Sequence, residues 1–558
     1  MRPVCRANTL LLVFSFMTLL FTAVSVNAGQ DSMKHLYEGV PFDMPEVQLP
    51  KIPEKTFYLR DFGAKADGIT DNSAAFAKAI KKIKRKGGGR LVISRGVWLS
   101  GPITLASNME LHLEHGALLK FIPDKALYPL IKTSYEGLDA WRPISPLYGV
   151  NLENIAITGS GVIDGSGGAW RYVKKSKLTS GQWKKLIASG GVVSDDGKMW
   201  FPSVESKQGA LEQKQTDIFK YNKEQAEKIH HWLRPVMVAL VDSDKVLLDG
   251  PTFQNSPAWN IHVLKSSNVV VRNLKVRNPW YSQNGDGLDM ESVKNALVYN
   301  NTFDVGDDAI CVKSGKNEDG RRRGIPTENV IIRNNMVYHA HGGFVVGSEM
   351  SGGVKNVFFS DATFIGTDIG IRFKSTRGRG GVVENIWISN VNMTDIVKNA
   401  ISFNMFYSNN EPRMADRLNR KAQPAVDETT PQFKNIDIKN VRSINSGTAV
   451  ILHGLPEMNL ENVHISDSYF SAKKGVEAVD TAGLKISNID LSTPAENAIV
   501  LLNAKAAHLS GIRLLDSQGV DVMGNKTENV HLDKALYSSK NLHIEDEVEK
   551  SQIMKIKK

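Results

Sequence analysis

Short apolar runs, each led by an asparagine, repeat along this chain, as in NVVVRN, NALVYN, NVIIRN and NIWISN. Several consecutive leading asparagines are separated by 27, 34, 27, 29 and 27 residues. Strands this short, divided by glycine, asparagine and aspartate turns without helices between them, indicate a sandwich, a barrel or a solenoid. The near-constant period favours the solenoid. The leading residues are Asn154, Asn268, Asn295, Asn329, Asn356, Asn385, Asn435 and Asn462.

We therefore expect an all-β fold, a right-handed parallel β-helix in which each coil buries its apolar side chains against the next coil. The leading asparagines can stack as a hydrogen-bonded ladder. Between residues 71 and 83 the period becomes helical, with Asp71 or Asn72 as the cap. We expect this short helix to close one end of the solenoid. Its apolar stripe is formed by Ala75, Phe76, Ala79, Ile80 and Ile83.

The N-terminal segment, residues 1–28, has the pattern of a signal peptide. Arg2 and Arg6 precede an apolar run, and Val26-Asn27-Ala28 is a small-residue cleavage site. The apolar run is short for a helix that crosses a membrane. We therefore expect a secreted or periplasmic protein that keeps no membrane span after processing.

The rest of the chain divides into three parts. We expect a proline-rich tether at residues 29–55, a β-helix domain at residues 56–545, and a charged C-terminal tail at residues 546–558. A long insertion at about residues 166–232 interrupts the domain and is expected to be partly helical. Loops of this length in a compact domain are usually functional or disordered.

Charge and cysteine content limit the partners and the bonds that hold the fold. The net charge is +10, and it is +8 without residues 1–28. A basic exported protein favours an anionic partner, and an acidic polysaccharide fits. The basic residues are not interleaved with stacking aromatic residues, which argues against nucleic acid. Only Cys311 follows the signal segment, so no intramolecular disulfide is possible. We expect a monomer.

Charged residues collect at similar offsets from the leading asparagine in successive middle coils. Because coils stack roughly 4.8 Å apart, similar offsets place these side chains in one column on an outer face. Neighbouring Asp307 and Asp308 can both reach that face only if the chain bends there, and Gly306 makes a bend plausible. The column consists of Asp286, Asp307, Asp308, His341, Arg372 and Lys374.

Three carboxylates beside a histidine and two cations suit acid–base hydrolysis of a glycoside. One carboxyl group must donate a proton to the leaving oxygen, and another must activate water. Crowded carboxylates separate their own pKa values, because like charges raise one of them. Taken alone, GDD is usually a turn. NGDGLD resembles a calcium loop, but no glutamate follows at the spacing of an EF-hand.

Five ordered motifs resemble glycoside hydrolase family 28, the polygalacturonases, and the segment DFGAKADGITDNSAAF is similar to the start of pectinase β-helices. The resemblance extends from about Phe57 to Val391. The motifs are NSPAWNIH, NGDGLD, GDDAICVKSG, HGGFVVGSEMSGGVKNV and IRFKSTRGRGG.

This resemblance implies an inverting hydrolase of galacturonic-acid linkages in pectin. It implies Asp307 as the general acid, Asp286 and Asp308 as bases that hold and activate water, and His341 as a residue that orients the acid. Further implied substrate-binding residues are Arg372 and Lys374, which would clamp a galacturonate carboxylate, together with Asn284. The resemblance implies no metal and no cofactor.

Two departures from the family pattern concern the shape of the subsites. Gly285 stands where the family commonly has threonine, and Phe373 stands where isoleucine is usual. Neither change removes a catalytic group.

We also expect exo action, because the insertion could form a wall at one end of the groove. Its tryptophans Trp170, Trp183 and Trp200 are suited to stacking on sugars. Arg322, in the run Arg321-Arg322-Arg323, could bind the carboxylate of a terminal sugar.

Two other functions remain open from the sequence. A calcium-dependent pectate lyase on the same fold would produce an unsaturated product and lose activity in a chelator. A non-catalytic carbohydrate-binding β-helix would keep the coils and release no reducing sugar. The sequence does not select among homogalacturonan, rhamnogalacturonan and xylogalacturonan.

Overall fold

The computed structural model of the chain describes residues 33–407, 423–516, 519–537 and 542–556. The chain divides into two units, residues 1–39 and residues 40–558. The described part of the first unit contains the 3-10 helix η1 (Lys34–Tyr37). The expected signal peptide lies outside the described residues.

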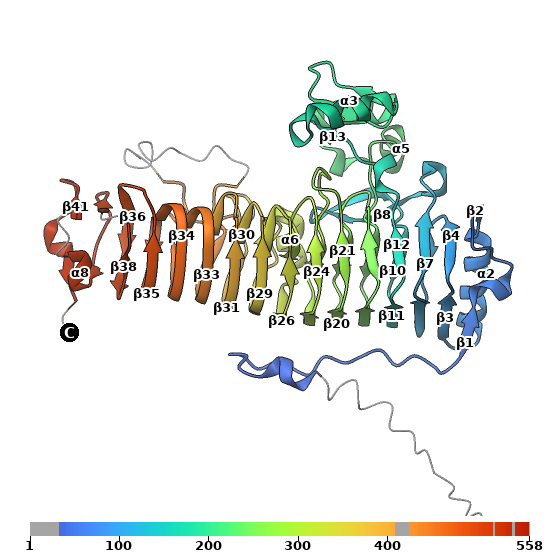
Figure 1. Ribbon diagram of the computed structural model, residues 1–558, viewed down its shortest axis with the longest axis horizontal. Coiled ribbons are helices and arrows are strands. Elements are labelled where there is room, and N and C mark those ends of the chain that lie inside the picture. The colour runs from blue at the N-terminus through green and yellow to red at the C-terminus, as the bar shows by residue number, and fades with distance from the viewer. Residues whose placement is uncertain (1–32, 408–422, 517–518, 538–541, 557–558) are drawn as a thin grey trace, which may run out of the picture. The chain divides into compact units, whose positions relative to one another are not determined.

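Residues 40–558 form a right-handed parallel β-helix, which confirms the expected fold class (Figure 1). One long sheet, here called the site sheet, carries the candidate residues, and all its strand pairs are parallel. Its strands in this region are β5 (Ile103–Thr104), β10 (Leu147–Val150), β16 (Val238–Val241), β19 (Ile261–Leu264), β22 (Leu288–Glu291), β25 (Ile310–Lys313), β28 (Gly342–Gly347), β30 (Ile369–Lys374) and β32 (Asn399–Asn404).

A second parallel sheet contains the strands that follow the leading asparagines and is called here the ladder sheet. Its strands are β1 (Thr56–Tyr58), β3 (Gly89–Ile93), β6 (Met109–Leu113), β11 (Glu153–Gly159), β17 (Asp244–Asp249), β20 (Ser267–Arg272), β23 (Lys294–Tyr299), β26 (Thr327–Arg333), β29 (Val354–Ile365), β31 (Val382–Thr394) and β33 (Gln432–His453). A third row of short strands comprises β2 (Asp67–Asp71), β4 (Gly96–Ser100), β7 (Ala117–Phe121), β12 (Val162–Asp164), β18 (Thr252–Gln254), β21 (Lys275–Arg277), β24 (Thr302–Asp304) and β27 (Met336–Val337).

The coils continue to the end of the described chain, and here one expected boundary is wrong. Strand β42 (Ile553–Lys555) lies in the expected charged tail but pairs in parallel with β40 (Val530–Leu532), so residues beyond 545 still belong to the β-helix. The other C-terminal elements are β34 (Leu460–Ala482), β35 (Lys485–Ser492), β36 (Asn497–Lys505), β37 (His508–Ser510), β38 (Arg513–Leu514), β39 (Gly519–Met523), α8 (Lys534–Tyr537), β41 (Leu542–Ile544) and η7 (Lys550–Gln552).

The leading asparagines form the expected ladder. Asn329 donates from Nδ2 to Asn295 Oδ1 over 3.1 Å, and Asn356 donates in turn to Asn329 Oδ1 over 3.2 Å. Asn385 and Asn462 bond in the same way to the asparagine of the preceding coil. The leading asparagines have positive φ, a backbone conformation that asparagine tolerates better than most residues. The ladder therefore satisfies the hydrogen-bonding groups of the side-chain amides, and its asparagines also stabilise the turn.

Helix α2 (Ser73–Arg85) packs against the first coils and closes the N-terminal end. Residues 40–55 belong to the expected tether. They lie along the coils and are bonded to them. The Gln48 amide donates to Asn268 Oδ1 over 3.3 Å, and the Lys51 amide donates to Asn154 Oδ1 over 3.0 Å. This extended segment therefore caps the asparagine ladder laterally.

The insertion between β12 and β16 stands off the β-helix as a small body of helices and short strands (Figure 1). Its elements are η4 (Gly167–Ala169), β13 (Val173–Lys174), η5 (Lys175–Lys177), α3 (Ser180–Ala188), β14 (Val192–Val193), β15 (Met199–Phe201), α4 (Val204–Gln215), η6 (Ile218–Lys220) and α5 (Lys223–Lys228). Two other interruptions of the coils were not predicted from the sequence. One consists of the 3-10 helix η3 (Lys125–Leu127) and the antiparallel hairpin of β8 (Leu130–Tyr135) and β9 (Leu138–Pro143), and the other is helix α6 (Asn317–Arg323). The 3-10 helix η2 (Leu59–Phe62) follows β1.

Within the described part of the chain, no helix is both long and apolar enough to cross a membrane.

Replacement of Asn329 tests the ladder. We expect Asn329→Ala to lower the free energy of unfolding by about 2–3 kcal/mol, because it loses two hydrogen bonds and places alanine at positive φ. Asn329→Gly loses the same bonds without the backbone strain. Its free energy of unfolding should therefore fall by about 1 kcal/mol less than that of Asn329→Ala. Urea unfolding measures both. Equal losses of unfolding free energy in the two variants would show that the positive φ at residue 329 adds no strain to the alanine variant.

Candidate active site

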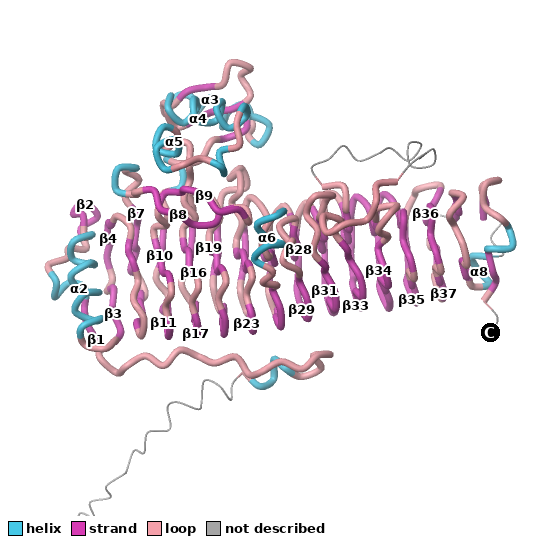
Figure 2. Tube along the Cα trace, turned by 180° about the vertical axis from the view of Figure 1, so that it is seen from behind, coloured by secondary structure: helices cyan, strands magenta, loops and turns pink. Residues whose placement is uncertain are grey.

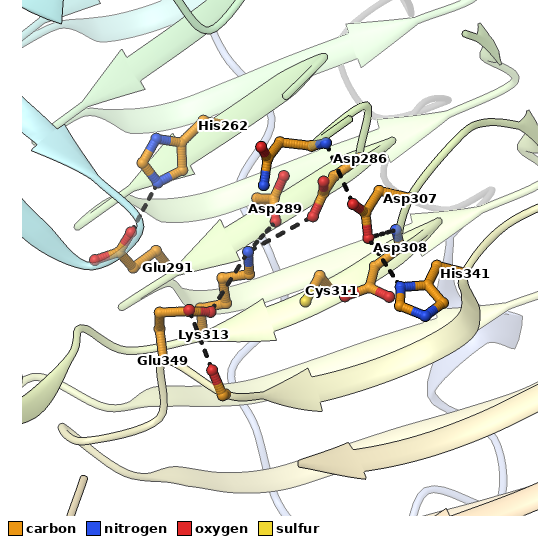
Figure 3. Close-up of polar contacts among 12 residues, drawn as sticks. His262, Asp286, Asp289, Glu291, Asp307, Asp308, Cys311, Lys313, His341 and Glu349 are labelled. Carbon is orange, nitrogen blue, oxygen red and sulfur yellow. Dashed lines mark hydrogen bonds and ion pairs between the residues drawn. The ribbon is translucent and has the colours of Figure 1, made fainter. Parts of the chain in front are cut away.

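The candidate residues lie where successive strands of the site sheet begin. Asp286 precedes β22, Asp307 and Asp308 precede β25, and His341 precedes β28. Because the strands are parallel and in register, each coil presents its polar residues at the same height. The structure thus brings the three aspartates and His341 into one cluster (Figure 3).

Asp308 is the buried, ionised member of this cluster. Its carboxylate accepts from Lys374 Nζ at 2.6 Å and lies 3.4 Å from Arg372 Nη1, and both cations extend from β30. Burial would raise the pKa of Asp308, but Lys374 and then Arg372 outweigh burial and hold that pKa well below its ordinary value. Lys374 and Arg372 lie two residues apart on one strand, so they point the same way.

Asp307 is the accessible carboxyl group, since its side chain is 26% exposed. Its Oδ1 lies 3.4 Å from His341 Nδ1, and its Oδ2 accepts from the backbone amide of Asn284 at 3.2 Å. Asn284 is itself held by Arg234, whose Nη2 donates to the Asn284 Oδ1 over 2.7 Å. Asp307 is therefore fixed from two sides while one edge faces solvent.

Asp286 is buried and belongs to a network that the sequence did not predict. Lys313 lies in its centre, with Nζ at 2.8 Å from Asp289 Oδ1 and 3.7 Å from both Asp286 Oδ2 and Glu349 Oε2 (Figure 3). Burial, then Asp289 and Asp307, raise the pKa of Asp286 well above its ordinary value. Asp286 Oδ1 is buried and has no hydrogen-bond partner among the described residues.

The pKa values of the two outer carboxylates of this network are shifted in opposite directions. Burial raises the pKa of Asp289 to about 6, although Lys313 opposes the shift. For Glu349, burial is outweighed by Lys313 and Lys374, and the pKa falls to about 2. One lysine is thus surrounded by carboxyl groups whose pKa values are shifted in opposite directions.

These extra residues were present in the quoted motifs, and a signal for them existed. Asp289 ends NGDGLD, Lys313 belongs to GDDAICVKSG, and Glu349 lies in HGGFVVGSEMSGG. Asp289 and Lys313 are charged residues within strands whose alternate side chains are apolar and buried, and Glu349 follows such a strand by two residues. Tyr407 had no such signal. Arg372 and Lys374 lie 5.5 Å and 5.1 Å from the centre of its ring.

Arg322 is not brought into this cluster. It lies on α6 with its side chain 64% exposed and pairs locally with Asp319 at 3.0 Å. The expectation for the insertion's tryptophans is wrong. Trp170, Trp183 and Trp200 are 1%, 7% and 7% exposed. Trp183 and Trp200 pack within the insertion, and Trp170 packs edge-on against Tyr128.

The exposed tryptophan near the site is instead Trp280, on the loop before Asn284. It is 51% exposed, and its Nε1 donates to the carbonyl of Lys177 in the insertion over 2.8 Å.

The two departures from the family pattern have packing explanations. A Cβ on Gly285 would lie 2.0 Å from Ser282 Oγ, so this backbone path excludes threonine. Phe373 points into the core and stacks on Phe403 with ring centres 4.2 Å apart. It therefore does not shape a subsite.

One group of side chains has the spacing of a metal site. Single ligand atoms of Asp307, Asp308 and His341 lie within 4.8 Å of one another. Lys374 and Arg372 already neutralise Asp308. The donor set therefore competes with two fixed cations, which does not favour a divalent ion there.

Over residues 182–475 the sequence matches the model of glycosyl hydrolases family 28. The chain belongs to this family. A probable polygalacturonase of Vitis vinifera is 29% identical over 466 residues, which cover 82% of this chain and 81% of that protein. An exo-poly-alpha-D-galacturonosidase of Dickeya chrysanthemi is 29% identical over 64% of this chain and 58% of its own length.

Solved structures agree with the sequence comparison. A hyperthermoactive exopolygalacturonase from Thermotoga maritima is 32% identical, with a TM-score of 0.65, and the match covers 80% of this chain and 93% of that structure. The family 28 exopolygalacturonase of Yersinia enterocolitica has the same fold, with a TM-score of 0.61 at 22% identity. This chain is therefore a family 28 glycoside hydrolase.

Replacement of Lys374 tests the ionisation of Asp308. A depressed folded-state pKa stabilises the fold above the ordinary carboxyl pKa, and this contribution is lost as pH falls through the folded-state value. Lys374→Met leaves Asp308 less compensated, so we expect a loss of about 3 kcal/mol of unfolding free energy at pH 7. The loss should shrink towards pH 4, as Asp308 becomes protonated in the variant.

Urea unfolding at the two pH values measures this difference. Lys245→Met, which breaks the more exposed pair with Glu153, is the matched control and should change stability by less than about 1 kcal/mol at either pH. An equal loss at both pH values for Lys374→Met would contradict an ionised Asp308.

Proposed function

We propose that this chain is an exo-acting hydrolase of galacturonic-acid linkages in pectin. The observation that carries the proposal is the division of labour between two adjacent carboxyl groups. Asp308 is buried and held ionised by two cations, whereas Asp307 is accessible and held beside His341. An acid-base hydrolase needs one carboxyl group that donates a proton and another that is ionised.

We assign Asp307 as the general acid, which protonates the leaving oxygen. Asp308 is the base, because Lys374 and Arg372 hold its pKa below the ordinary value and so favour its ionised form. Asp286 has a raised pKa and a buried Oδ1 without a partner, so it is better suited to holding the attacking water than to removing its proton. This separates two residues that the sequence analysis treated alike.

The substrate class follows from charge. Arg372 and Lys374 lie beside Asp308 with side chains that are only 10% and 8% exposed, and a guanidinium can bind a sugar carboxylate through two hydrogen bonds. The net charge of +10 favours an acidic polymer over a neutral one. Trp280, on the loop before Asn284, offers an exposed aromatic ring. The relatives are named for polygalacturonate hydrolysis.

The same features disfavour the alternatives. A calcium-dependent lyase requires carboxylates free to bind the ion, and Asp308 is instead paired with Lys374 and Arg372. A non-catalytic binding protein has no need to bury a cluster of opposed charges. We further propose export by the N-terminal segment, action as a monomer, no nucleic-acid partner, and no cofactor.

The acid role gives a direct test. We expect Asp307→Asn to lower turnover on polygalacturonate by about 10²–10⁴-fold, because an amide cannot donate the proton. Reducing-sugar release measures turnover, and circular dichroism checks the fold. Asp304→Asn is the matched control, since Asp304 lies on the same coil and pairs with His339 on the surface. Near-normal turnover in Asp307→Asn would remove Asp307 from the acid role.

Exo action gives a second test. We expect early products from polygalacturonate to be monomeric galacturonic acid while the viscosity of the solution stays high. The physical reason is that release from a chain end shortens each polymer by one unit at a time. Chromatography of early products and viscometry measure the two quantities. A ladder of oligomers with a fast fall in viscosity would mean internal cleavage.

A further inference from the structure

The outer face of the site sheet is closed on one side of the aspartates. Alternate residues of β19 and β22 point into the core, so His262, Asp289 and Glu291 point outward, yet they are only 2%, 0% and 0% exposed. On the following coils, the side chains of Asp307 and His341 are 26% and 34% exposed. The face is therefore covered on the N-terminal side of the cluster and accessible at the cluster itself.

The hairpin β8–β9 supplies this cover. It crosses the coils of β10, β16 and β19 and reaches helix α6 (Figure 2). The ring of Tyr135 lies 5.0 Å from that of Trp259, which directly precedes β19. At the hairpin tip, the carbonyl of Gly137 accepts from the backbone amide of Lys316, which follows β25, over 3.1 Å.

One arginine ties the hairpin to the site sheet. Arg323, at the end of α6, donates from Nη1 to Glu291 Oε1 over 3.0 Å and from Nη2 to Asp139 Oδ1 over 2.8 Å. The same Nη2 lies 3.3 Å from the Gly137 carbonyl and from Ser134 Oγ. Arg323 thus joins a buried carboxylate at the end of β22 to a carboxylate and two polar groups of the hairpin.

We propose that Arg323 is a positioning residue for chain-end specificity. It holds hairpin β8–β9 across the N-terminal side of the groove, so that a bound polymer must end there. The planar guanidinium suits this task, because it binds two carboxylates in fixed directions at once. Arg323 does not touch Asp307, Asp308 or His341. The proposal rests on the exo action proposed above and assigns the wall to the hairpin and α6. The insertion packs against the hairpin, since Ile218, Ala226 and Ile229 form one cluster with Leu130.

The test is a change in product length. In Arg323→Gln the hairpin loses its charged link to Glu291, while Glu291 keeps its bond to His262 at 2.9 Å. We expect the ratio of oligomers to monomer among the early products from polygalacturonate to rise about tenfold. This is the factor associated with losing one charge-assisted hydrogen bond. Viscosity should fall correspondingly faster at equal reducing-sugar release. A purely structural role would lower activity and leave product length unchanged.

Two further variants sharpen the experiment. Gly137→Ala acts on the hairpin tip alone, since Gly137 has φ +74 and a Cβ there would lie 2.8 Å from the backbone nitrogen of Lys316. It should shift product length in the same direction, and it carries the test if Arg323→Gln does not fold. Arg272→Gln is the control, because it breaks a comparable pair with Asp249 on the ladder sheet. Its products should match those of the wild type.

The outcomes separate this proposal from the proposed function. Monomer alone from wild type and from both hairpin variants would overturn the role of Arg323 and leave exo hydrolysis standing. Oligomers from the wild type would overturn exo action, and the role of Arg323 with it. Absence of hydrolysis by the wild type would overturn the proposed function itself.

Discussion

Parallel hydrogen bonding between successive coils is the constraint on which the rest of this structure depends. Each strand of the site sheet pairs in register with the strand before and after it, so that Asp289 faces Cys311 and Val345 faces Arg372. The pairing fixes which side chains of adjacent coils lie next to one another. The sequence must therefore place compatible residues at equal heights of adjacent coils, and the active site is the place where these residues are charged.

The charges in this column are arranged so that each buried carboxylate meets a cation. Lys374 and Arg372 serve Asp308, Lys313 serves Asp289 and Glu349, and Arg323 serves Glu291. Removing a single partner would leave an uncompensated charge in a medium of low polarity, which is strongly unfavourable. The column is thus a mutually dependent set. Asp286 has only the more distant contact with Lys313, at 3.7 Å, and Asp307 lies beside His341 rather than beside a lysine or arginine.

The sequence predicted what depends on period and missed what depends on contacts between distant segments. The β-helix, the asparagine ladder and the clustering of Asp286, Asp307, Asp308 and His341 all follow from equal offsets along equal coils. The link between Arg323 and Asp139 joins residues that share no repeat and lie far apart in the chain. No periodic signal could have revealed it, just as none revealed the hairpin.

Two errors have the same physical origin. The tryptophans of the insertion were expected at the sugar, but a segment of that length must bury apolar surface of its own before it can present any. Arg322 was chosen from a run of three arginines, and a helix directs adjacent residues to different sides. Composition identifies such residues as candidates, and only the local geometry decides which of them faces the site.

The asparagine ladder also determines how a protein of this kind can change in length. Asn329 donates from its amide nitrogen to the preceding coil and accepts at its amide oxygen from the following coil, so its two neighbours meet it in the same way. A complete coil can therefore be inserted or deleted at either end with its edges still matched, whereas the loss of one residue inside a strand would turn every following side chain to the wrong face. Growth by whole turns leaves the catalytic column untouched, and it makes the turn, rather than the residue, the natural unit in which the molecule can evolve.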